Sequence, residues 1–379
     1  MGSPSDASKM NTKRILLISA YLPGDGGIEC VIKNLYPEFL KLGYELELCI
    51  LSIPKFPDWY KGITARHYDI YLPYVRSFHL YTLIKMKSIV KILSVELSRA
   101  PDIIIFTHTF LGIPIFITKK LAYNNKPILF WPNCSLFSSG NMFKKLYTWI
   151  NCSFTDACLA ISSSIYAQLK SLFPQIIIEL VYNPLNKSND EIRLRSNSKT
   201  KKLIYMSRLE DKQKNISFLL NGLALITASG LDKWELSILG DGPSEKQLKN
   251  LASKLNLNNR ILWHGYIQDP WKHINEADCL LLTSRNEGLP LVLGDAIQRG
   301  CPIISSDCAG TEDIVKDNIN GWSYREGDMG SFISVMSAFL KEELYLDDYA
   351  AMLRSIDEFK PEKVAGRFVA CFEAIKGRK

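Results

Sequence analysis

The chain has 379 residues, 47% of them hydrophobic and 22% charged, and its formal net charge is +7. Its length favours two domains, and its composition is that of an ordinary globular protein. The sequence has no run of 18 apolar residues, which argues against a membrane-spanning helix, and no Walker loop, which argues against a P-loop nucleotidase. Its nine cysteines include no C-x-x-C pair, which argues against a zinc site and fits a protein of the reduced cytosol.

The positive charge lies in the first half of the chain. Residues 1–190 hold 20 Lys or Arg and 13 Asp or Glu, a balance of +7, whereas the remaining residues hold 26 of each. A basic half suits nucleic acid, an anionic membrane or a phosphorylated acceptor, and we favour the last two because no nucleic-acid module is recognisable. We interpret the first nine residues as the remnant of an expression tag, and we expect the natural chain to start at Met10.

Short apolar runs alternate with helical segments throughout, which predicts buried parallel strands. A polar stretch, 183–202, marks the domain boundary. The predicted strands are 15–19, 46–51, 103–106, 128–131, 158–161 and 176–181 in the first half, and 203–206, 235–239, 260–263, 279–282 and 302–305 in the second. We therefore expect two doubly wound Rossmann-like α/β domains, 10–185 and 200–360, with ligands bound in a cleft between them.

Helices are predicted at 29–42, 88–98 and 242–255, the last with Pro243 in its first turn. The segment 78–97 mixes Lys85, Lys87 and Lys91 with apolar residues. It fits an amphipathic helix on anionic lipid and, equally, a core-packed helix with solvated lysines.

Three polar segments follow predicted strands. In the first, Gly26 and Gly27 would let backbone approach a ligand beside a helix start, although a plain tight turn fits as well. It is not G-x-G-x-x-G, so no nicotinamide cofactor is indicated.

The second segment, 207–215, contains Arg208 and Lys214. A guanidinium fork and an ammonium converging at one strand end suit a diphosphate, and a solvated charge run is the alternative.

The third segment holds Glu287 and, eight positions later, Asp295, on either side of a helix start near Pro290. The two carboxylates would lie roughly 10 Å apart, at a 1.5 Å rise per residue. That span suits a sugar at one end, a diphosphate at the helix N-terminus and a ribose at the other end.

Residues 203–321 resemble the donor-binding domain of the retaining GT-B glycosyltransferases of family 4. The matching stretches are SRLEDKQKN (207–215), LGDGP (239–243), HGY (264–266), 276–307, GTEDIV (310–315) and NGW (320–322), with weaker matches at GDGGIE (24–29), PDIIIFTH (101–108) and WPNCSL (131–136). The pattern is similar to bacterial lipopolysaccharide, O-antigen and capsule transferases.

The resemblance implies a role for each matching residue. The implied catalytic residues are His108, Arg208, Lys214 and Glu287. The implied donor-binding residues are Arg208, Lys214, Glu287, Gly26, Gly27, Gly288, Leu289, Pro290, Leu291 and Asp295. The implied acceptor-binding residue is Asn133. Arg208 and Lys214 would hold the diphosphate, Glu287 the sugar hydroxyls, and the backbone amides from 288 to 291 the distal phosphate. Asp295, where the family usually has glutamate, would hold the ribose. Asn133 stands near a position where relatives often have histidine, so no proton transfer is assigned to it.

The resemblance further implies a hexosyltransferase whose C-terminal helix, 362–376 within 362–379, returns to the first domain. From the scattered cysteines we expect the protein in the cytoplasm, and from the basic first half and segment 78–97 peripheral contact with the inner face of the plasma membrane is one of two alternatives. Its donor would be a nucleotide-sugar, for which we expect UDP with galactose, glucose or N-acetylglucosamine, and its acceptor a lipid-linked, lipopolysaccharide or capsule glycan. No cofactor and no metal are expected, since a D-x-D turn is missing from the sequence. A nucleotide-sugar 2-epimerase and a non-catalytic nucleotide-sugar-binding subunit remain as alternatives.

Overall fold

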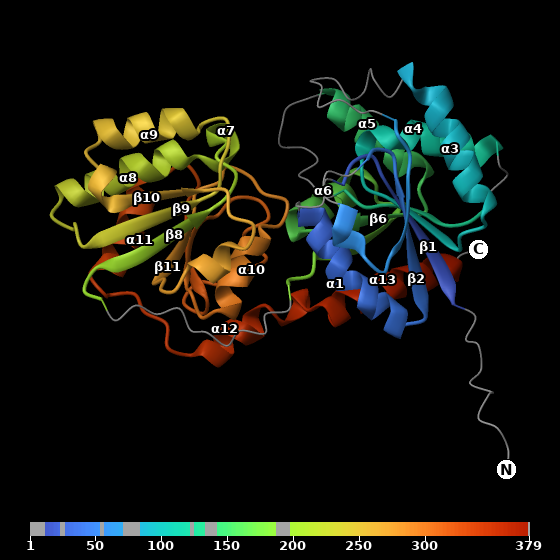
Figure 1. Ribbon diagram of the computed structural model, residues 1–379. Helices are drawn as coiled ribbons and strands as arrows, with labels where there is room; N and C mark the ends of the chain where they lie inside the picture. The colour runs from blue at the N-terminus through green and yellow to red at the C-terminus, as the bar shows by residue number, and fades with distance from the viewer. Residues whose placement is uncertain are drawn as a thin grey trace, which may run out of the picture. The chain divides into compact units, whose positions relative to one another are not determined.

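A computed structural model describes residues 12–22, 27–53, 57–70, 84–121, 125–132, 142–186 and 198–377. The chain divides into two compact units, residues 1–186 with 360–379, and residues 187–359 (Figure 1). Each unit is built on one parallel sheet with helices on both faces, which confirms the predicted pair of doubly wound α/β domains.

The sheet of the first unit has the strand order β3-β2-β1-β4-β5-β6-β7. Its strands are β1 (Lys13–Ser19), β2 (Tyr44–Ile50), β3 (Thr64–His67), β4 (Ile103–Phe106), β5 (Ile128–Phe130), β6 (Ala157–Ala160) and β7 (Ile177–Leu180). Six of these strands match predicted ones. The edge strand β3, TARH, escaped prediction because it is polar and only half-buried. The strand order reverses between β1 and β4, so the segments that follow these two strands share one edge of the sheet.

Two groups of helices cover this sheet. They are α1 (Gly27–Lys41), α3 (Met86–Ser98), α4 (Gly112–Leu121), α5 (Met142–Phe154), α6 (Ser163–Leu172) and α13 (Pro361–Lys376). The C-terminal helix α13 packs along α1, with the Phe368 ring 5.5 Å from that of Phe39 and 5.1 Å from that of Trp131. The predicted return of the C-terminal helix to the first domain is therefore confirmed.

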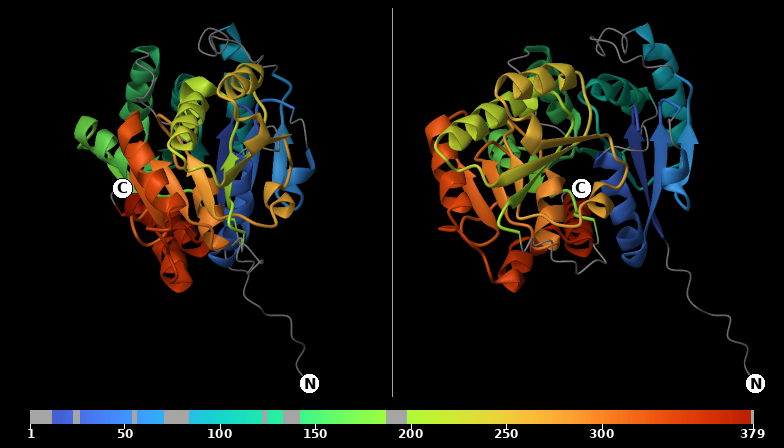
Figure 2. Two further views of the ribbon diagram at one scale, coloured as in Figure 1. Left: turned by 90° about the vertical axis from the view of Figure 1, so that its left-hand side faces the viewer. Right: turned by 60° about the vertical axis from the view of Figure 1, so that its left-hand side comes forward.

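The sheet of the second unit has the order β10-β9-β8-β11-β12-β13. Its strands are β8 (Lys201–Met206), β9 (Trp234–Leu239), β10 (Ile261–Gly265), β11 (Cys279–Leu282), β12 (Ile303–Ser306) and β13 (Gly321–Tyr324), and its helices are α7 (Asp211–Lys214), α8 (Ile216–Ala228), α9 (Glu245–Lys254), α10 (Leu291–Gln298), α11 (Met329–Leu340) and α12 (Tyr349–Ser355). Helices α8, α9 and α11 lie on one face, and α10 and α12 on the other (Figure 2). The reversal falls between β8 and β11, whose following loops therefore meet.

Helix α9 begins at Glu245, so the expectation that Pro243 occupies its first turn is wrong. The residues before α9 are tied to the loop after β8 instead. The Ser244 amide donates to the carbonyl of Leu209 at 3.0 Å, and the Ser244 hydroxyl accepts from the Asp211 amide at 3.0 Å. These bonds hold 242–244 in an irregular path and fix the loop that carries Arg208 and Lys214.

Candidate functional site

An ion pair joins the two loops that meet at the reversal of the second sheet. Lys214 closes α7, which follows β8, and Glu287 lies in the turn after β11. Lys214 Nζ lies 2.7 Å from Glu287 Oε1, and the two side chains are 18% and 9% exposed. Charge-assisted bonds of this length in a sheltered place are among the strongest polar contacts in proteins. The structure thus brings together two of the residues that the sequence singles out.

Hydrogen bonds to backbone carbonyl oxygens hold α7 against the turn after β11. The Lys214 carbonyl accepts from the Thr283 hydroxyl at 2.9 Å and from the Tyr205 hydroxyl at 3.2 Å. The Arg285 amide donates to the Gln213 carbonyl at 2.8 Å, and Gln213 Nε2 donates to the Asn286 carbonyl at 3.2 Å. Sequence reasoning missed Tyr205, Gln213 and Thr283 as parts of the site, since none carries a charge or interrupts a pattern.

Glycines allow the loops of the site to pack closely. Gly310 has φ +89°, and a Cβ there would lie 2.5 Å from the Gly288 carbonyl oxygen. Gly240 has φ +129°, and its Cβ would lie 1.9 Å from the Ser207 carbonyl oxygen. Only glycine fits such positions without displacing a loop. The glycines of the sequence stretches 310–315 and 239–243 therefore shape the backbone that carries Glu287 and Arg208.

Helix α10 begins at Leu291, directly after the turn that carries Glu287. Pro290 has no N–H and cannot donate to a phosphate, so its predicted role as an amide donor is wrong. The amides of Gly288, Leu289 and Leu291 do carry hydrogens, and the first amides of a helix lack partners within the helix. This helix end attracts anions through its dipole.

Asp295 and Arg208 lie farther from the ion pair along the chain. Asp295 is the fifth residue of α10 and half-buried, one turn beyond the helix start. The Arg208 side chain is 57% exposed, and its Nη1 lies 4.0 Å from Oε2 of Glu210. This separation is at the outer limit for an ion pair, so the guanidinium retains most of its hydration and is accessible to an incoming anion.

The thiol of Cys308 lies close enough to the ion pair to sense its charges. Burial and the negative charge of Glu287 together raise the pKa of Cys308 to about 12, and Lys214 opposes this shift. A thiol with such a pKa stays protonated at neutral pH and is a poor nucleophile. The Cys308 side chain therefore packs beneath the site without a chemical part in it.

In the first unit, His108 follows β4 and lies beside the end of β1. Its Nδ1 lies 2.9 Å from the Thr107 hydroxyl and accepts from the Ala20 amide at 3.4 Å. A backbone N–H can only donate, so this network places the imidazole proton on Nε2. Burial lowers the pKa of His108 to about 4. At neutral pH the ring is uncharged and offers one N–H donor.

The remaining predicted residues belong to the first unit. Gly27 is the first residue of α1 and is exposed, and a Cβ there would meet nothing within 4 Å. Its immediate surroundings therefore leave room for a ligand. Gly26 and Asn133 lie outside the described residues. Within the described ranges, no group of three or more His, Cys, Asp or Glu side chains is arranged to hold a metal ion.

Comparison with known proteins identifies relatives of this chain. Residues 186–355 match the family Glycosyl transferases group 1. The chain is 29% identical to the lipopolysaccharide 1,6-galactosyltransferase of Escherichia coli, and the match covers 97% of this chain and 100% of the relative. It is 28% identical to the enzyme of the same name from Salmonella typhimurium, over 87% of this chain and 90% of the relative.

Solved structures show the same fold. The apo form of the lipopolysaccharide outer core galactosyltransferase WaaB superposes with a TM-score of 0.79 at 26% identity, covering 95% of this chain and 99% of that one. Anabaena HepE, solved with UDP and glucose, gives 0.75 at 16% identity, covering 95% and 99%. Residues 186–355 therefore match the Glycosyl transferases group 1 model, and the chain has the GT-B fold and the general activity of a glycosyltransferase.

Proposed function

We propose that the protein is a retaining hexosyltransferase of family 4 that moves a hexose from a UDP-sugar to a lipopolysaccharide or capsule glycan without a metal ion. The observation that carries this proposal is the Lys214–Glu287 pair, 2.7 Å long, set directly before the N-terminus of α10. It offers an ammonium and helix amides to a diphosphate, and a carboxylate to the sugar beside it.

The chemistry requires stabilisation of the leaving group. Breaking the glycosyl–phosphate bond leaves negative charge on the diphosphate and positive charge on the sugar. Lys214, Arg208 and the amides before α10 would stabilise that negative charge. Preorganised donors of this kind contribute on the order of 10²–10³-fold each to a rate. With retention, the departing phosphate oxygen takes the proton of the acceptor hydroxyl.

The remaining residues would position the two ends of the donor. Glu287 would accept from sugar hydroxyls through the oxygen that Lys214 does not hold. Asp295 would accept from the ribose, and because it is one methylene shorter than glutamate we expect a weaker contact there, bridged by water. We place His108 near the donor sugar, where its Nε2–H would donate to a hydroxyl, with Gly26 and Gly27 along the donor and Asn133 toward the acceptor.

The nature of the relatives supports galactose as the hexose. Both lipopolysaccharide relatives are named as 1,6-galactosyltransferases, and HepE was solved with UDP and glucose. The named relatives transfer sugars, so a 2-epimerase is not favoured. A non-catalytic binding subunit has no need for a lysine placed against the leaving phosphate.

The proposed acceptor is anchored in a membrane, so the protein would work as a peripheral cytoplasmic enzyme. Within the described residues, no helix is both long and apolar enough to cross a bilayer. Of the segment predicted to contact lipid, 78–97, the part from 78 to 83 lies outside the described residues, and α3 forms most of the rest.

The test is a transfer reaction with purified protein, UDP-galactose and a lipopolysaccharide core that lacks its outer galactose. We expect UDP release that depends on the acceptor, and a product whose new linkage has the α configuration of the donor in its NMR spectrum. UDP-glucose and UDP-N-acetylglucosamine serve as competing donors. Donor consumption without any acceptor, giving a 2-epimer, would refute the proposal, and a β linkage would refute retention.

A further inference from the structure

Four helices share one face of the first sheet. The chain moves in a single direction across the sheet from β3 to β7, and right-handed crossovers then put α3, α4, α5 and α6 on the same side. The neighbours α3 and α4 pack together, as do α4 and α5, where the rings of Phe116 and Phe154 lie 5.4 Å apart. Their outward side chains form one surface, here called the α3–α6 face.

Acidic groups on this face are few, and each one is paired. Residues 84–173 contain ten Lys or Arg and three Asp or Glu. Glu96 is fully buried and lies 2.7 Å from Arg66 Nε. Asp102 lies 3.4 Å from Lys126 Nζ, and Asp156 lies 3.5 Å from Lys119 Nζ. The exposed Lys87, Lys91, Lys120 and Lys170 therefore give this face a positive potential.

Contacts with β3 and with the core fix the orientation of α3. Glu96 accepts from Arg66 of β3 and from the Tyr68 hydroxyl, and Ile89, Leu93 and Leu97 are buried on the same side of the helix. The opposite stripe at helical spacing must then face outward, and it contains Lys87, Ser88, Lys91 and Val95. Ile84, two residues before the helix, is 71% exposed.

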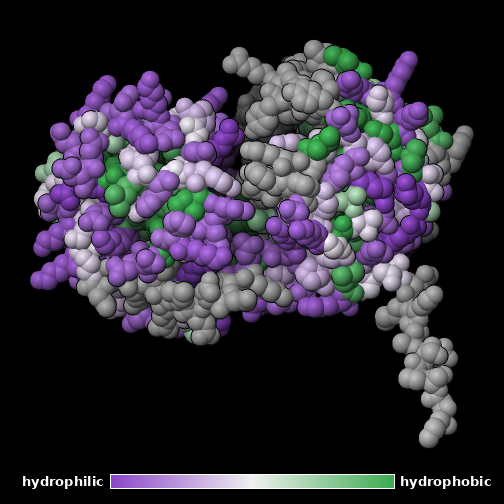
Figure 3. Space-filling view, in the orientation of Figure 1, coloured by the Kyte–Doolittle hydropathy of each residue, from purple (hydrophilic) through white to green (hydrophobic). Residues whose placement is uncertain are grey.

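Large apolar side chains stand exposed on the other helices of the face. Phe116 and Leu121 project from α4, Leu146 and Trp149 from α5, and Leu172 from α6; Trp149 is 58% exposed. Figure 3 shows hydrophobic residues at the surface near α3, set among hydrophilic ones. Exposed tryptophan and leucine beside lysine, without acidic groups, are typical of surfaces that lie in a membrane interface.

We propose that the α3–α6 face docks on an anionic lipid bilayer, with lysines at the lipid headgroups and Trp149, Leu146 and Ile84 inserted at the interface. The surface is wider than the single segment suggested by the sequence. It does not depend on the Lys214–Glu287 pair, which lies in the other unit. Each lysine near an anionic surface raises the partition coefficient about fivefold.

The experiment measures binding of the full-length protein to vesicles by sedimentation, with phosphatidylcholine alone and with added phosphatidylglycerol. We expect binding only to the anionic vesicles, weakened by salt. The double variant Lys87→Gln/Lys91→Gln should bind about 25-fold more weakly, as two factors of five. Trp149→Ser should weaken the residual binding that persists at high salt, where insertion dominates.

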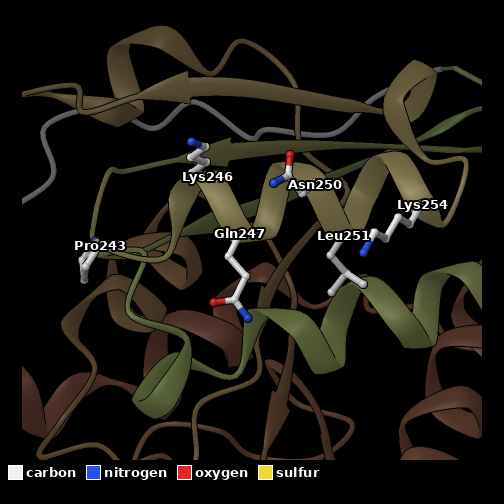
Figure 4. A pocket seen from close by; sticks show the side chains of 6 residues that line it. All are labelled: Pro243, Lys246, Gln247, Asn250, Leu251 and Lys254. Carbon is white, nitrogen blue, oxygen red and sulfur yellow. The ribbon is translucent and has the colours of Figure 1, made fainter.

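Helix α9 of the second unit supplies a matched control. Lys246 and Lys254 of α9 are exposed, and both line a groove of about 510 Å³ (Figure 4). Lys246→Gln/Lys254→Gln removes the same charge and should bind vesicles like the native chain. Equal losses in the two double variants, or no binding to anionic vesicles, would overturn the proposal. Transfer to a soluble acceptor fragment should be unchanged in Lys87→Gln/Lys91→Gln, and this measurement separates membrane docking from the proposed activity.

Discussion

Lys214 Nζ lies 2.7 Å from Glu287 Oε1, and this contact joins the loops that follow the two central strands of the second sheet. Both side chains are mostly buried, so neither charge is stable there without the other. An ammonium ion has three hydrogens, and the pair uses one of them. Lys214 can therefore keep its partner while it binds a phosphate, and the pair sets the position of the ammonium before the donor arrives.

Lys214→Ala should lower kcat on the proposed donor by about 10²–10³-fold, because it removes a charge that stabilises the leaving diphosphate. Glu287→Ala should lose activity to a similar degree, since it removes a sugar contact and releases Lys214 from its position. Steady-state UDP release with saturating acceptor measures both.

The control for this prediction is Lys212→Ala, which removes an exposed lysine from the same short helix. It should retain kcat within about twofold, as expected for a surface charge with weak interactions. Circular dichroism and melting temperature verify that each variant folds. Full turnover by folded Lys214→Ala would show that the leaving group is stabilised elsewhere.

Gly310→Ala should damage the site through its backbone. The new Cβ would lie 2.5 Å from the Gly288 carbonyl oxygen, so the turn that carries Glu287 must move. We expect a destabilisation of about 1–3 kcal/mol, as for an overpacked site, together with loss of transfer.

Gly327→Ala is the matched control for Gly310→Ala. Gly327 has φ +74°, close to the +89° of Gly310, but a Cβ there meets nothing within 4 Å. It should show only the backbone strain, about 1 kcal/mol in urea denaturation, and retain activity. Equal loss of activity in both variants would mean that the contact with Gly288 is unimportant.

The sequence predicted the apolar strands and the loops that carry the charges, because periodicity and turn residues are local signals. It missed β3 and β13, whose sequences TARH and GWSY lack an apolar run and gain their structure from pairing at a sheet edge. It also misplaced the start of α9, where hydrogen bonds to the distant residues Leu209 and Asp211 override the helical preference of Pro243.

The sequence predicted the charged residues of the site but not the uncharged residues that hold them in position. Arg208, Lys214 and Glu287 stand out because charge after a buried strand is unusual. Thr283 and Tyr205, which hold the Lys214 carbonyl, sit at ordinary strand ends, and only the fold shows that they meet it. The ion pair itself joins residues 73 positions apart and has no sequence signal.

Removal of divalent cations should leave the proposed transfer unaffected. Lys214, Arg208 and the amides before α10 would supply the positive potential that a metal gives the diphosphate in other transferases. Rates in EDTA and in added Mg²⁺ or Mn²⁺ should agree within about twofold, a difference too small to correspond to a lost charge contact. A loss of activity in EDTA that Mn²⁺ restores would contradict this part of the proposal.

The last prediction concerns the protonation of His108. Its pKa is lowered by burial to about 4 in the folded protein, against about 6.5 in an unfolded chain. As pH falls through this window the unfolded chain takes up a proton that the folded ring does not. The contribution of the neutral ring to the free energy of unfolding is therefore greatest above a pH of about 6.5. It decreases, by at most about 3 kcal/mol, as the pH falls to about 4.

His108→Gln removes this titration while keeping an amide near Thr107 and Ala20. The melting temperature of the native chain should therefore fall more steeply than that of His108→Gln between pH of about 6.5 and 4. Buried or paired carboxylates such as Asp102, whose pKa is lowered, titrate in both proteins and cancel in the comparison. Nitrogen NMR at neutral pH should show the His108 proton on Nε2, as the hydrogen bond from the Ala20 amide requires. Parallel melting curves, or a proton on Nδ1, would remove His108 as a fixed hydrogen-bond donor to the sugar.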